Sequence, residues 1–333
     1  MRKAFIILAV LLLILFFLGC CQRPPEPPPP PPDGDIGAGD YTFTIEHNGA
    51  TRKYFVHVPS SYDASVQTPV LLNFHGGAGS AQGHATNTEM NAKSDEEGFI
   101  AVHPAGTRRD LDPNRQYQRF WNLGPGPDDP YYDPGDPIGE VDDIGFVNKI
   151  LDELESNFNV DEKRVYVTGL SNGGFLIHYL ACELSDRIAA IAPIACVFFT
   201  IPADCNPSRA VSVIQFHGTD DRCVLYDGGP SECGQEKLDR VFISAAESIA
   251  IWAEKNNCSS TPIVTYQNGD VTCETYGNCD EGAEVVLCTI EGGGHTWPGG
   301  RPYTIPGLDI GPVTYDISAN DAMWEFFESH PIP

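Results

Sequence analysis

The order of apolar and polar residues along the chain predicts strands and helices in alternation. Residues 41–46 alternate, turn at Asn48-Gly49 and resume at 54–58, which is the signal of a β-hairpin. Short apolar runs typical of buried parallel strands follow at residues 70–74, 99–102, 164–168, 188–194, 211–216 and 285–290. Segments of helical character lie between them, at residues 86–97, 142–158, 175–184, 242–255 and 319–328.

This alternation predicts an α/β fold, with a mainly parallel sheet that helices cover on both faces. Neither an internal repeat nor a second domain boundary interrupts it, so residues 40–333 are expected to form a single domain. Functional sites in such sheets lie at the carboxyl ends of the strands, which directs attention to the loops that follow each predicted strand.

The first residues do not share this pattern. A basic start at Arg2 precedes an apolar run over residues 4–18, and Gly19 follows, so residues 1–19 are expected to be an export signal. The run is short for a bilayer span. Cys20 resembles the lipidation site of prokaryotic lipoproteins, and an uncleaved N-terminal anchor is the alternative. In both cases the rest of the chain is expected to lie outside the cytoplasm, secreted or at the cell surface.

Residues 20–39 are expected to link this leader to the domain. They contain a proline run from Pro24 to Pro32 that only Glu26 interrupts, which favours extended polyproline II and offers no apolar side chains to bury. The run is therefore interpreted as a stiff stalk between the membrane and the domain.

The cysteines agree with export. Of the 11, Cys20 and Cys21 belong to the leader, and nine lie between Cys182 and Cys288. An exported domain oxidises such cysteines to disulfides, and an odd number leaves at least one thiol unpaired. Zinc is the alternative, but no pair has the Cys-x-x-Cys spacing of a zinc ribbon, so no metal is predicted.

The net charge of the chain limits the kinds of partner that it is expected to bind. The formal net charge is −26, which should repel nucleic acids and anionic membrane surfaces, so membrane contact is expected only through the N-terminus.

A long loop over residues 104–137 is rich in Pro, Gly, Asp and aromatic residues, and loops of this length are often functional. Residues 128–143 contain no Lys or Arg, which indicates a solvated acidic loop, with a calcium site as the alternative.

The motif most directly tied to chemistry is the Gly-x-Ser-x-Gly stretch at residues 169–173. It directly follows the strand predicted at 164–168 and precedes a predicted helix. Glycines permit a sharp strand-to-helix turn because a Cβ on either side would clash, and the turn lifts the serine oxygen above the sheet beside a helix N-terminus. Ser171 is therefore the expected nucleophile. A glycine-rich connection without chemistry is the alternative.

A serine hydroxyl needs a base, and in folds with this turn the chain order is serine, acid, histidine. Four histidines follow the serine. His178 lies inside a predicted helix, His217 ends a strand ahead of the acid candidates, and His330 is next to the C-terminus. His295 follows the last predicted strand inside the glycine-flanked segment 292–299, where an imidazole would be accessible, and it is the predicted base.

The acid should follow a strand between the serine and this histidine. Either Asp220 or Asp221, just after the strand at 211–216, could orient the imidazole, and spacing alone does not choose between them. The oxyanion needs two backbone donors. One should be the N–H of Asn172, and the other should come from the glycine-rich loop at 75–79. No Lys-Ser/Thr follows these glycines, so neither a phosphate-binding loop nor a cofactor is predicted.

Taken together, these residues resemble the secreted esterase family that groups polyhydroxybutyrate depolymerase-like proteins with feruloyl and acetyl xylan esterases, within the α/β-hydrolase superfamily. The resembling segments are spread over most of the domain in the family's order: Asn73–Gly77, Arg119–Gly124, Val141–Phe146, Arg164–Gly174, His217–Asp221 and Gly293–Gly299.

The resemblance implies roles that spacing leaves open. It implies an α/β-hydrolase fold, Asp221 as the acid and Gly77 as the second oxyanion amide. Many relatives have Cys where this chain has Gly77, so a disulfide at that point is not expected here. The family also implies a disulfide between Cys258 and Cys279, although Cys273 and Cys288 lie near enough in the sequence to exchange partners with them.

The expected function is that of an extracytoplasmic serine carboxylesterase, most readily for feruloyl or acetyl xylan type esters on plant polysaccharide. Trp121 and Trp297 are the aromatics expected near an aromatic acid or sugar, with core or loop packing as their alternative. Other hypotheses are depolymerisation of hydroxyalkanoate oligomers, a serine peptidase with the same three residues, and an inactive surface-binding protein that kept the fold.

Overall fold

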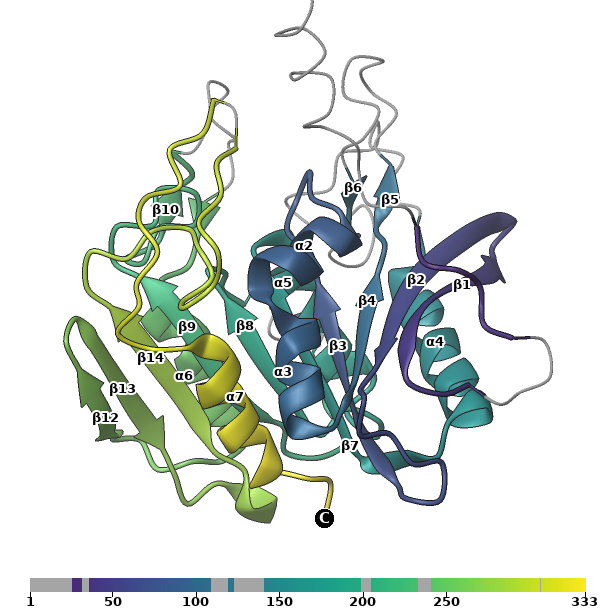
Figure 1. Cartoon of the computed structure of the whole chain (residues 1–333). Coiled ribbons are helices and arrows are strands. Elements are labelled where there is room, and N and C mark those ends of the chain that lie inside the picture. The colour runs from purple at the N-terminus through teal and green to yellow at the C-terminus, as the bar shows by residue number, and fades with distance from the viewer. Residues whose placement is uncertain are drawn as a thin grey trace, which may run out of the picture.

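The computed structural model describes residues 26–31, 36–108, 119–122, 141–198, 205–232, 241–305 and 307–333. Its centre is a ten-stranded sheet in the order β1-β2-β4-β3-β7-β8-β9-β14-β13-β12 (Figure 1). The strands are β1 Gly39–His47, β2 Ala50–Val58, β3 Thr68–Phe74, β4 Ile100–Pro104, β7 Val160–Leu170, β8 Ala190–Ile194, β9 Ser212–Gly218, β12 Ile263–Asn268, β13 Val271–Tyr276 and β14 Val285–Ile290. Two small ribbons lie outside it, β5 Thr107–Arg108 with β6 Arg119–Phe120 and β10 Gly229–Pro230 with β11 Val241–Phe242.

Helices cover both faces of this sheet. The helices are α2 Ala81–Thr88, α3 Met90–Glu97, α4 Asp143–Asn157, α5 Asn172–Glu183, α6 Ala245–Lys255 and α7 Ala319–Glu328, with a short 3₁₀ turn at Asp280–Gly282. Helices α2, α3 and α7 lie in front of the sheet in Figure 1, and α4, α5 and α6 lie behind it. Side chains alternate between the two cores along β3, because Val70 and Leu72 pack with α4 and α5 while Leu71 packs with α3 and α7.

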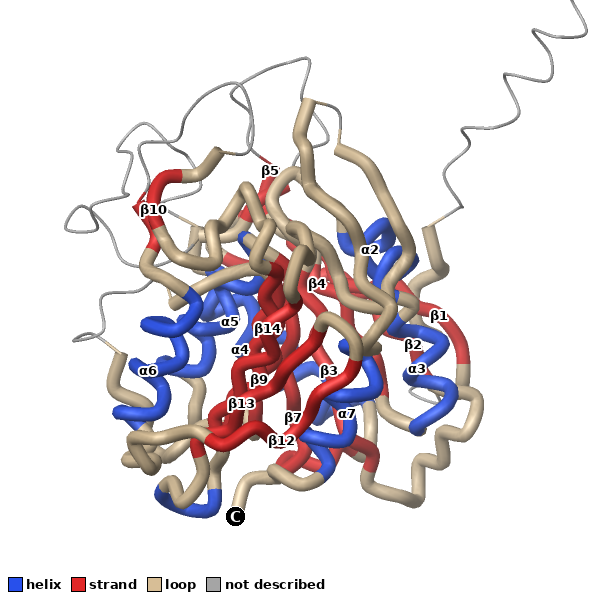
Figure 2. Tube along the Cα trace, turned by 90° about the vertical axis from the view of Figure 1, so that its left-hand side faces the viewer, coloured by secondary structure: helices blue, strands red, loops and turns tan. Residues whose placement is uncertain are grey.

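The predicted fold class is confirmed. The six central strands from β4 to β14 are parallel, and the antiparallel strands lie at the two edges. The predicted hairpin is β1–β2, and its turn residues Asn48 and Gly49 have φ of 49° and 77°, as a two-residue hairpin turn requires. The loops that follow the parallel strands gather at one end of the molecule (Figure 2).

The structure differs from the expected elements in two places. The single helix expected over residues 86–97 is two helices, because Glu89 has a φ of 54° that a continuous helix does not allow. The β12–β13 hairpin was not predicted at all. Every residue of β12 is exposed, so the strand has no alternation of buried and exposed positions, and only the Asn268-Gly269 pair at the turn marks it in the sequence.

Part of the predicted stalk contacts the domain. Within residues 26–31, the Pro28 carbonyl accepts a hydrogen bond from the Thr42 N–H at 2.8 Å, and Glu26 lies 2.7 Å from Lys53 Nζ. These contacts place the segment along the outer edge of β1, where it covers backbone that an edge strand would otherwise leave open. The proline run is therefore not wholly a free spacer.

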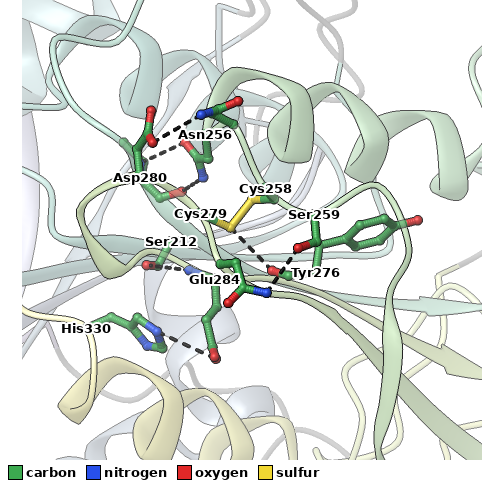
Figure 3. The surroundings of a disulfide bond; sticks show 12 residues. Ser212, Asn256, Cys258, Ser259, Tyr276, Cys279, Asp280, Glu284 and His330 are labelled. Carbon is green, nitrogen blue, oxygen red and sulfur yellow. Dashed lines mark hydrogen bonds and ion pairs between the residues drawn. A yellow bond between two sulfur atoms is a disulfide. The ribbon is translucent and has the colours of Figure 1, made fainter.

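Among the described residues, disulfides lie only in the C-terminal half of the chain. The structure forms Cys182–Cys205, Cys258–Cys279 and Cys273–Cys288, and Cys223 is also disulfide-bonded, to a partner outside the described residues. Cys196 is free and buried. The expected pairing of Cys258 with Cys279 is confirmed, as is the unpaired thiol. Figure 3 shows the Cys258–Cys279 bond beside Asn256 and Asp280, whose backbones are joined by a 2.8 Å hydrogen bond.

The leader predicted at residues 1–19 and the lipidation site at Cys20 lie outside the described residues. Among the residues that the structure does describe, no helix combines the length and the apolar character that crossing a bilayer requires.

Candidate active site

Ser171 lies in a strained turn between β7 and α5. Its φ and ψ are 53° and −118°, a backbone conformation that residues other than glycine rarely adopt. Glycine is required on both sides: a Cβ on Gly169 would lie 2.7 Å from the Gly173 backbone, and one on Gly173 would lie 2.5 Å from the Phe74 carbonyl. The side chain is only half-buried, so the geometry is that of the nucleophile elbow expected from the sequence.

His295 and Asp221 form a buried pair above the ends of β14 and β9. His295 Nδ1 donates to Asp221 Oδ2 at 2.8 Å, while Asp220 is exposed and uses its backbone N–H to hold Gly293. The structure thus places Asp221, and not its neighbour, against the imidazole. The Ser171 hydroxyl has no hydrogen bond within the described part of the chain, so its contact with His295 stays a prediction.

The Asp221 carboxylate is held from both sides. Its Oδ1 accepts from the backbone N–H groups of Cys223 and Val224 at 2.8 and 2.9 Å. Burial would raise the pKa of Asp221, but the charge and hydrogen bond of His295 and the backbone donors outweigh it and lower the pKa below its usual value. The group therefore stays ionised and can stabilise a positive imidazolium.

The other three histidines that follow Ser171 lie elsewhere. His178 is inside α5 and accepts from Trp252 Nε1 at 2.9 Å, and His330 bonds the Phe326 carbonyl near the C-terminus. His217 lies next to Asp221 but is buried behind it, with 3.6 Å between its Nε2 and Asp221 Oδ2. Only His295 therefore combines an acidic partner with a place in a loop after the last parallel strand.

The predicted oxyanion loop lies directly against the elbow. A Cβ on Gly76 would lie 3.5 Å from Ser171 Cβ, and one on Gly77 would lie 3.5 Å from Asn172 Cβ. Within the described ranges, neither the Gly77 nor the Asn172 N–H donates to a protein acceptor. Both expected donors are thus close together and uncommitted.

His75 fixes the direction of one of these donors. Its Nδ1 donates to the Gly76 carbonyl at 2.8 Å, and its Nε2 accepts from the Gly106 N–H at 3.0 Å. The Gly79 N–H also donates to the Gly76 carbonyl. Because a trans peptide points its C=O and N–H in opposite directions, holding the Gly76 carbonyl turns the Gly77 N–H the other way. Burial lowers the pKa of His75 to about 4, so the imidazole is neutral at pH 7.

The segment at residues 119–122 closes the back of this loop. The Asn172 side chain accepts from the Trp121 N–H at 2.7 Å, and Trp121 Nε1 donates to the His75 carbonyl at 2.9 Å. The side chain of Asn172 thus supports the loop that its own backbone N–H completes. Sequence reasoning gave this asparagine a backbone role only, although its place in the resembling Ser171-Asn172-Gly173 stretch was a signal.

A buried ion pair ties the same segment to the sheet. Arg52 Nη2 lies 2.6 Å from Asp143 Oδ1, and Asp143 Oδ2 accepts from the Asn122 N–H at 2.7 Å. Burial raises the pKa of Asp143, against the opposing effect of Arg52. Residues 128–143 were expected to form a solvated acidic loop. Asp143, the last of them, is instead buried and paired with Arg52. Residues 128–140 lie outside the described part of the chain.

Both candidate aromatics are buried. Trp121 and Trp297 are each 2% exposed, and Trp297 Nε1 donates to Asn320 at 3.0 Å. Their indole N–H groups thus bond protein acceptors and their rings pack against His75 and His84. This arrangement favours the packing role that the sequence left open over direct contact with a substrate.

One cluster of the described residues has metal-ligand geometry, namely Asp221, Cys223 and His295. Cys223 is disulfide-bonded and offers no thiolate, and the other two are already paired with each other. The donor set therefore does not fit a metal ion.

Comparison with known proteins supports the resemblance. The chain is 32% identical to feruloyl esterase B of Piromyces equi over 253 residues, covering 75% of this chain and 44% of that protein. It is 29% identical to the putative esterase NocK of Nocardia uniformis subsp. tsuyamanensis, covering 84% and 79% of the two chains. Weaker relatives are a bifunctional acetylxylan esterase/xylanase and poly(3-hydroxyalkanoate) depolymerase C. The chain spans less than half the length of the Piromyces protein. No family model matches it.

The fold has a solved counterpart as well. An acetyl xylan esterase from Aspergillus awamori superimposes with a TM-score of 0.57 at 15% identity, over 86% of this chain and 98% of that one. At this identity the match bears on the fold alone, and it agrees with the mainly parallel sheet described above. The chain is thus similar to feruloyl esterases, an acetylxylan esterase and a poly(3-hydroxyalkanoate) depolymerase, on the α/β-hydrolase fold.

Proposed function

We propose that the protein is a serine carboxylesterase in which Ser171, His295 and Asp221 act as nucleophile, base and acid. The observation that carries this proposal is the buried 2.8 Å bond between His295 Nδ1 and Asp221, in the same layer of loops as the strained serine turn. The bond fixes the tautomer that leaves His295 Nε2 free to accept a proton.

The reaction is acyl transfer in two steps. Ser171 Oγ attacks the ester carbonyl while His295 Nε2 takes the hydroxyl proton, and the N–H groups of Gly77 and Asn172 hold the oxyanion. His295 then gives that proton to the leaving alkoxide, and the alcohol departs from an acyl-enzyme. A water molecule, deprotonated by the same imidazole, attacks the acyl carbon, and collapse of this second oxyanion releases the acid and restores the serine.

The substrate proposal rests on the relatives. Feruloyl or acetyl xylan type esters are favoured because the most similar relatives include a feruloyl esterase and a bifunctional acetylxylan esterase/xylanase. Hydroxyalkanoate oligomers are the second candidate, supported by the depolymerase at 27% identity over 44% of this chain. The two buried tryptophans add nothing to this choice, since each is only 2% exposed.

We also propose that the enzyme works outside the cytoplasm, carried there by residues 1–19 and anchored by a lipid on Cys20. Disulfides at Cys182–Cys205, Cys258–Cys279 and Cys273–Cys288 support an oxidising compartment. Labelling cells with a radioactive fatty acid tests the anchor: the protein should take up label, and a Cys20→Ala variant should not. A wild-type protein without label would contradict it.

A substrate panel tests the reaction. Methyl ferulate, acetylated xylo-oligosaccharide, hydroxybutyrate oligomers and a peptide amide should be offered to the purified protein and to a Ser171→Ala variant. We expect ester hydrolysis by the wild type and none by the variant, with an unchanged circular dichroism spectrum. Amide cleavage alone would favour a peptidase, and no turnover of any member would favour an inactive binding protein.

A further inference from the structure

A second histidine lies behind the acid of the proposed triad and takes no part in the proton transfers described above. His217 is at the end of β9 and is 1% exposed. Its Nε2 lies 3.6 Å from Asp221 Oδ2, the same oxygen that accepts from His295 Nδ1 at 2.8 Å. The Tyr226 ring packs nearly perpendicular to it, with 5.7 Å between the ring centroids. Such a group is too buried to exchange protons with a substrate, so its function must be sought in what it holds.

His217 holds the far end of the loop that presents Asp221. Its Nε2 donates to the Val224 carbonyl at 2.8 Å. The N–H of the same residue, Val224, donates to Asp221 Oδ1 at 2.9 Å. Both backbone groups of Val224 are therefore hydrogen-bonded: its carbonyl accepts from His217, and its N–H donates to the Asp221 carboxylate.

The hydrogen bond also fixes the tautomer of His217. A carbonyl oxygen can only accept, so the proton lies on Nε2 and Nδ1 is unprotonated. Nδ1 is buried and makes no hydrogen bond of normal geometry within the described residues, although the Cys196 backbone lies close enough to the ring to oppose the lowering of its pKa. Burial, the largest influence, lowers the pKa of His217 despite the opposing effect of Asp221, so the ring remains neutral beside the carboxylate.

We propose that His217 is a positioning residue for Asp221: its Nε2–H orients the Val224 backbone, and this backbone aims the carboxylate at His295. The same Nε2 lies 3.6 Å from Asp221 Oδ2, so the ring also contacts the carboxylate directly. This inference rests on the proposed function, because positioning matters only if the Asp221–His295 pair takes part in turnover.

Two substitutions of similar polarity separate this role from simple packing. The amide nitrogen of Gln reaches the position of the imidazole Nε2, whereas that of Asn reaches only the position of Nδ1. His217→Gln therefore keeps a donor to Val224, and His217→Asn loses it. Both leave a small void, so their effects on folding should be alike.

The experiment measures kcat and KM for the best ester of the panel, with active enzyme counted by fluorophosphonate labelling. We expect His217→Gln to keep kcat within about threefold of the wild type. His217→Asn should lower kcat by about 10- to 100-fold at unchanged KM, which is less than the roughly 10⁴-fold loss that removal of a triad carboxylate causes. Equal kcat for both variants, or loss in Gln with retention in Asn, would overturn the proposal.

A double-mutant cycle tells a failure of this inference from a failure of the proposed function. In an Asp221→Asn background, His217→Asn should have little further effect, because both changes remove the same interaction. Full additivity would show that His217 acts independently of Asp221 and would overturn the inference. If Asp221→Asn itself leaves kcat unchanged, the proposed triad is wrong, and the positioning role falls with it.

Discussion

The two halves of the sheet hold their parts of the site by different means. The half with β3, β4 and β7 carries the serine turn and the oxyanion loop, and no cysteine occurs between Cys21 and Cys182. Close glycine contacts and the hydrogen bonds of His75 hold it. The half with β9 and β14 carries Asp221 and His295, and disulfides lock its surroundings.

This difference follows from what each half has to present. The oxyanion half presents backbone N–H groups, which only close backbone packing can aim, and bulky cross-links would not fit there. The acid–base half presents side chains on long loops. Cys223 is two residues from Asp221, and Cys288 is in β14, the strand that leads to His295, so covalent bonds restrain both loops. The two halves should therefore respond differently to reduction.

The largest effect on kcat is expected at Asp221, the proposed acid in the half with β9 and β14. Asp221→Asn should lower kcat by about 10⁴, because the amide cannot stabilise the imidazolium and favours the wrong tautomer of His295. Asp220→Asn is the matched control and should change kcat little, since Asp220 is exposed. Kinetics on any accepted ester decide the matter, and the opposite ranking would assign the acid to Asp220.

Acid should destabilise the protein through its buried histidines, of which His75 and His103 lie at β3 and β4. Burial lowers the pKa of His75 to about 4 and that of His103 to about 3, from 6.5 in an unfolded chain. As the pH falls below about 6.5, these two histidines bind protons in the unfolded chain but stay neutral in the folded protein. The free energy of unfolding therefore falls until the pH reaches the pKa of the folded state. His75 alone should cost on the order of 3 kcal/mol by pH 4.

Urea unfolding between pH 7 and pH 4.5 measures this slope. A His103→Gln variant cannot take up the proton and should show a shallower dependence on pH than the wild type. An identical slope in the two proteins would mean that the buried imidazole at position 103 does not contribute to acid sensitivity.

Loss of a disulfide should weaken the half with β9 and β14. Replacing both Cys273 and Cys288 by Ser should lower the free energy of unfolding by about 2–4 kcal/mol. It should also speed hydrogen exchange in residues 291–299, because only backbone pairing would then hold β13 to β14. The Cys182→Ser/Cys205→Ser variant is the control, with a similar loss of stability but no change in that loop. Faster exchange around His75 in either variant would contradict the division into two halves.

The smallest effect is expected at His75. His75→Asn keeps a donor near Nδ1 for the Gly76 carbonyl, whereas His75→Gln moves it away. We expect kcat to fall about tenfold in the Gln variant and less in the Asn variant, below the 10²–10³ that loss of an oxyanion donor costs. The order is the reverse of that expected at His217, because the two histidines carry opposite tautomers. The same order at both positions would refute this contrast.

Much of the site could be predicted because it depends on local chemistry. The turn at Ser171 needs glycines on both sides, and those glycines are visible in the sequence. The place of His295 followed from a glycine-flanked loop after the last parallel strand. The choice between Asp220 and Asp221 could not be made from spacing, because it depends on which side chain turns inward between two backbone donors.

What the sequence did not predict depends on contacts between distant segments. The supporting roles of His75 and His217 come from backbone groups at Gly106 and Val224 that no motif marks. The β12–β13 hairpin has no buried side on its outer strand, so hydrophobic periodicity had nothing to detect. Tryptophan is a residue type that often lines binding sites, so the sequence could not show that Trp121 is buried and packs against Phe74 and His75.

The most direct test of the central claim is covalent labelling of the nucleophile. The folded protein should be treated with a fluorophosphonate at pH 7.5, digested and analysed by mass spectrometry, with Ser171→Ala and His295→Ala variants alongside. The account predicts one modified residue, Ser171, with no labelling in the first variant and greatly slowed labelling in the second. A folded wild-type protein that stays unlabelled, or that is labelled at another serine, would contradict it.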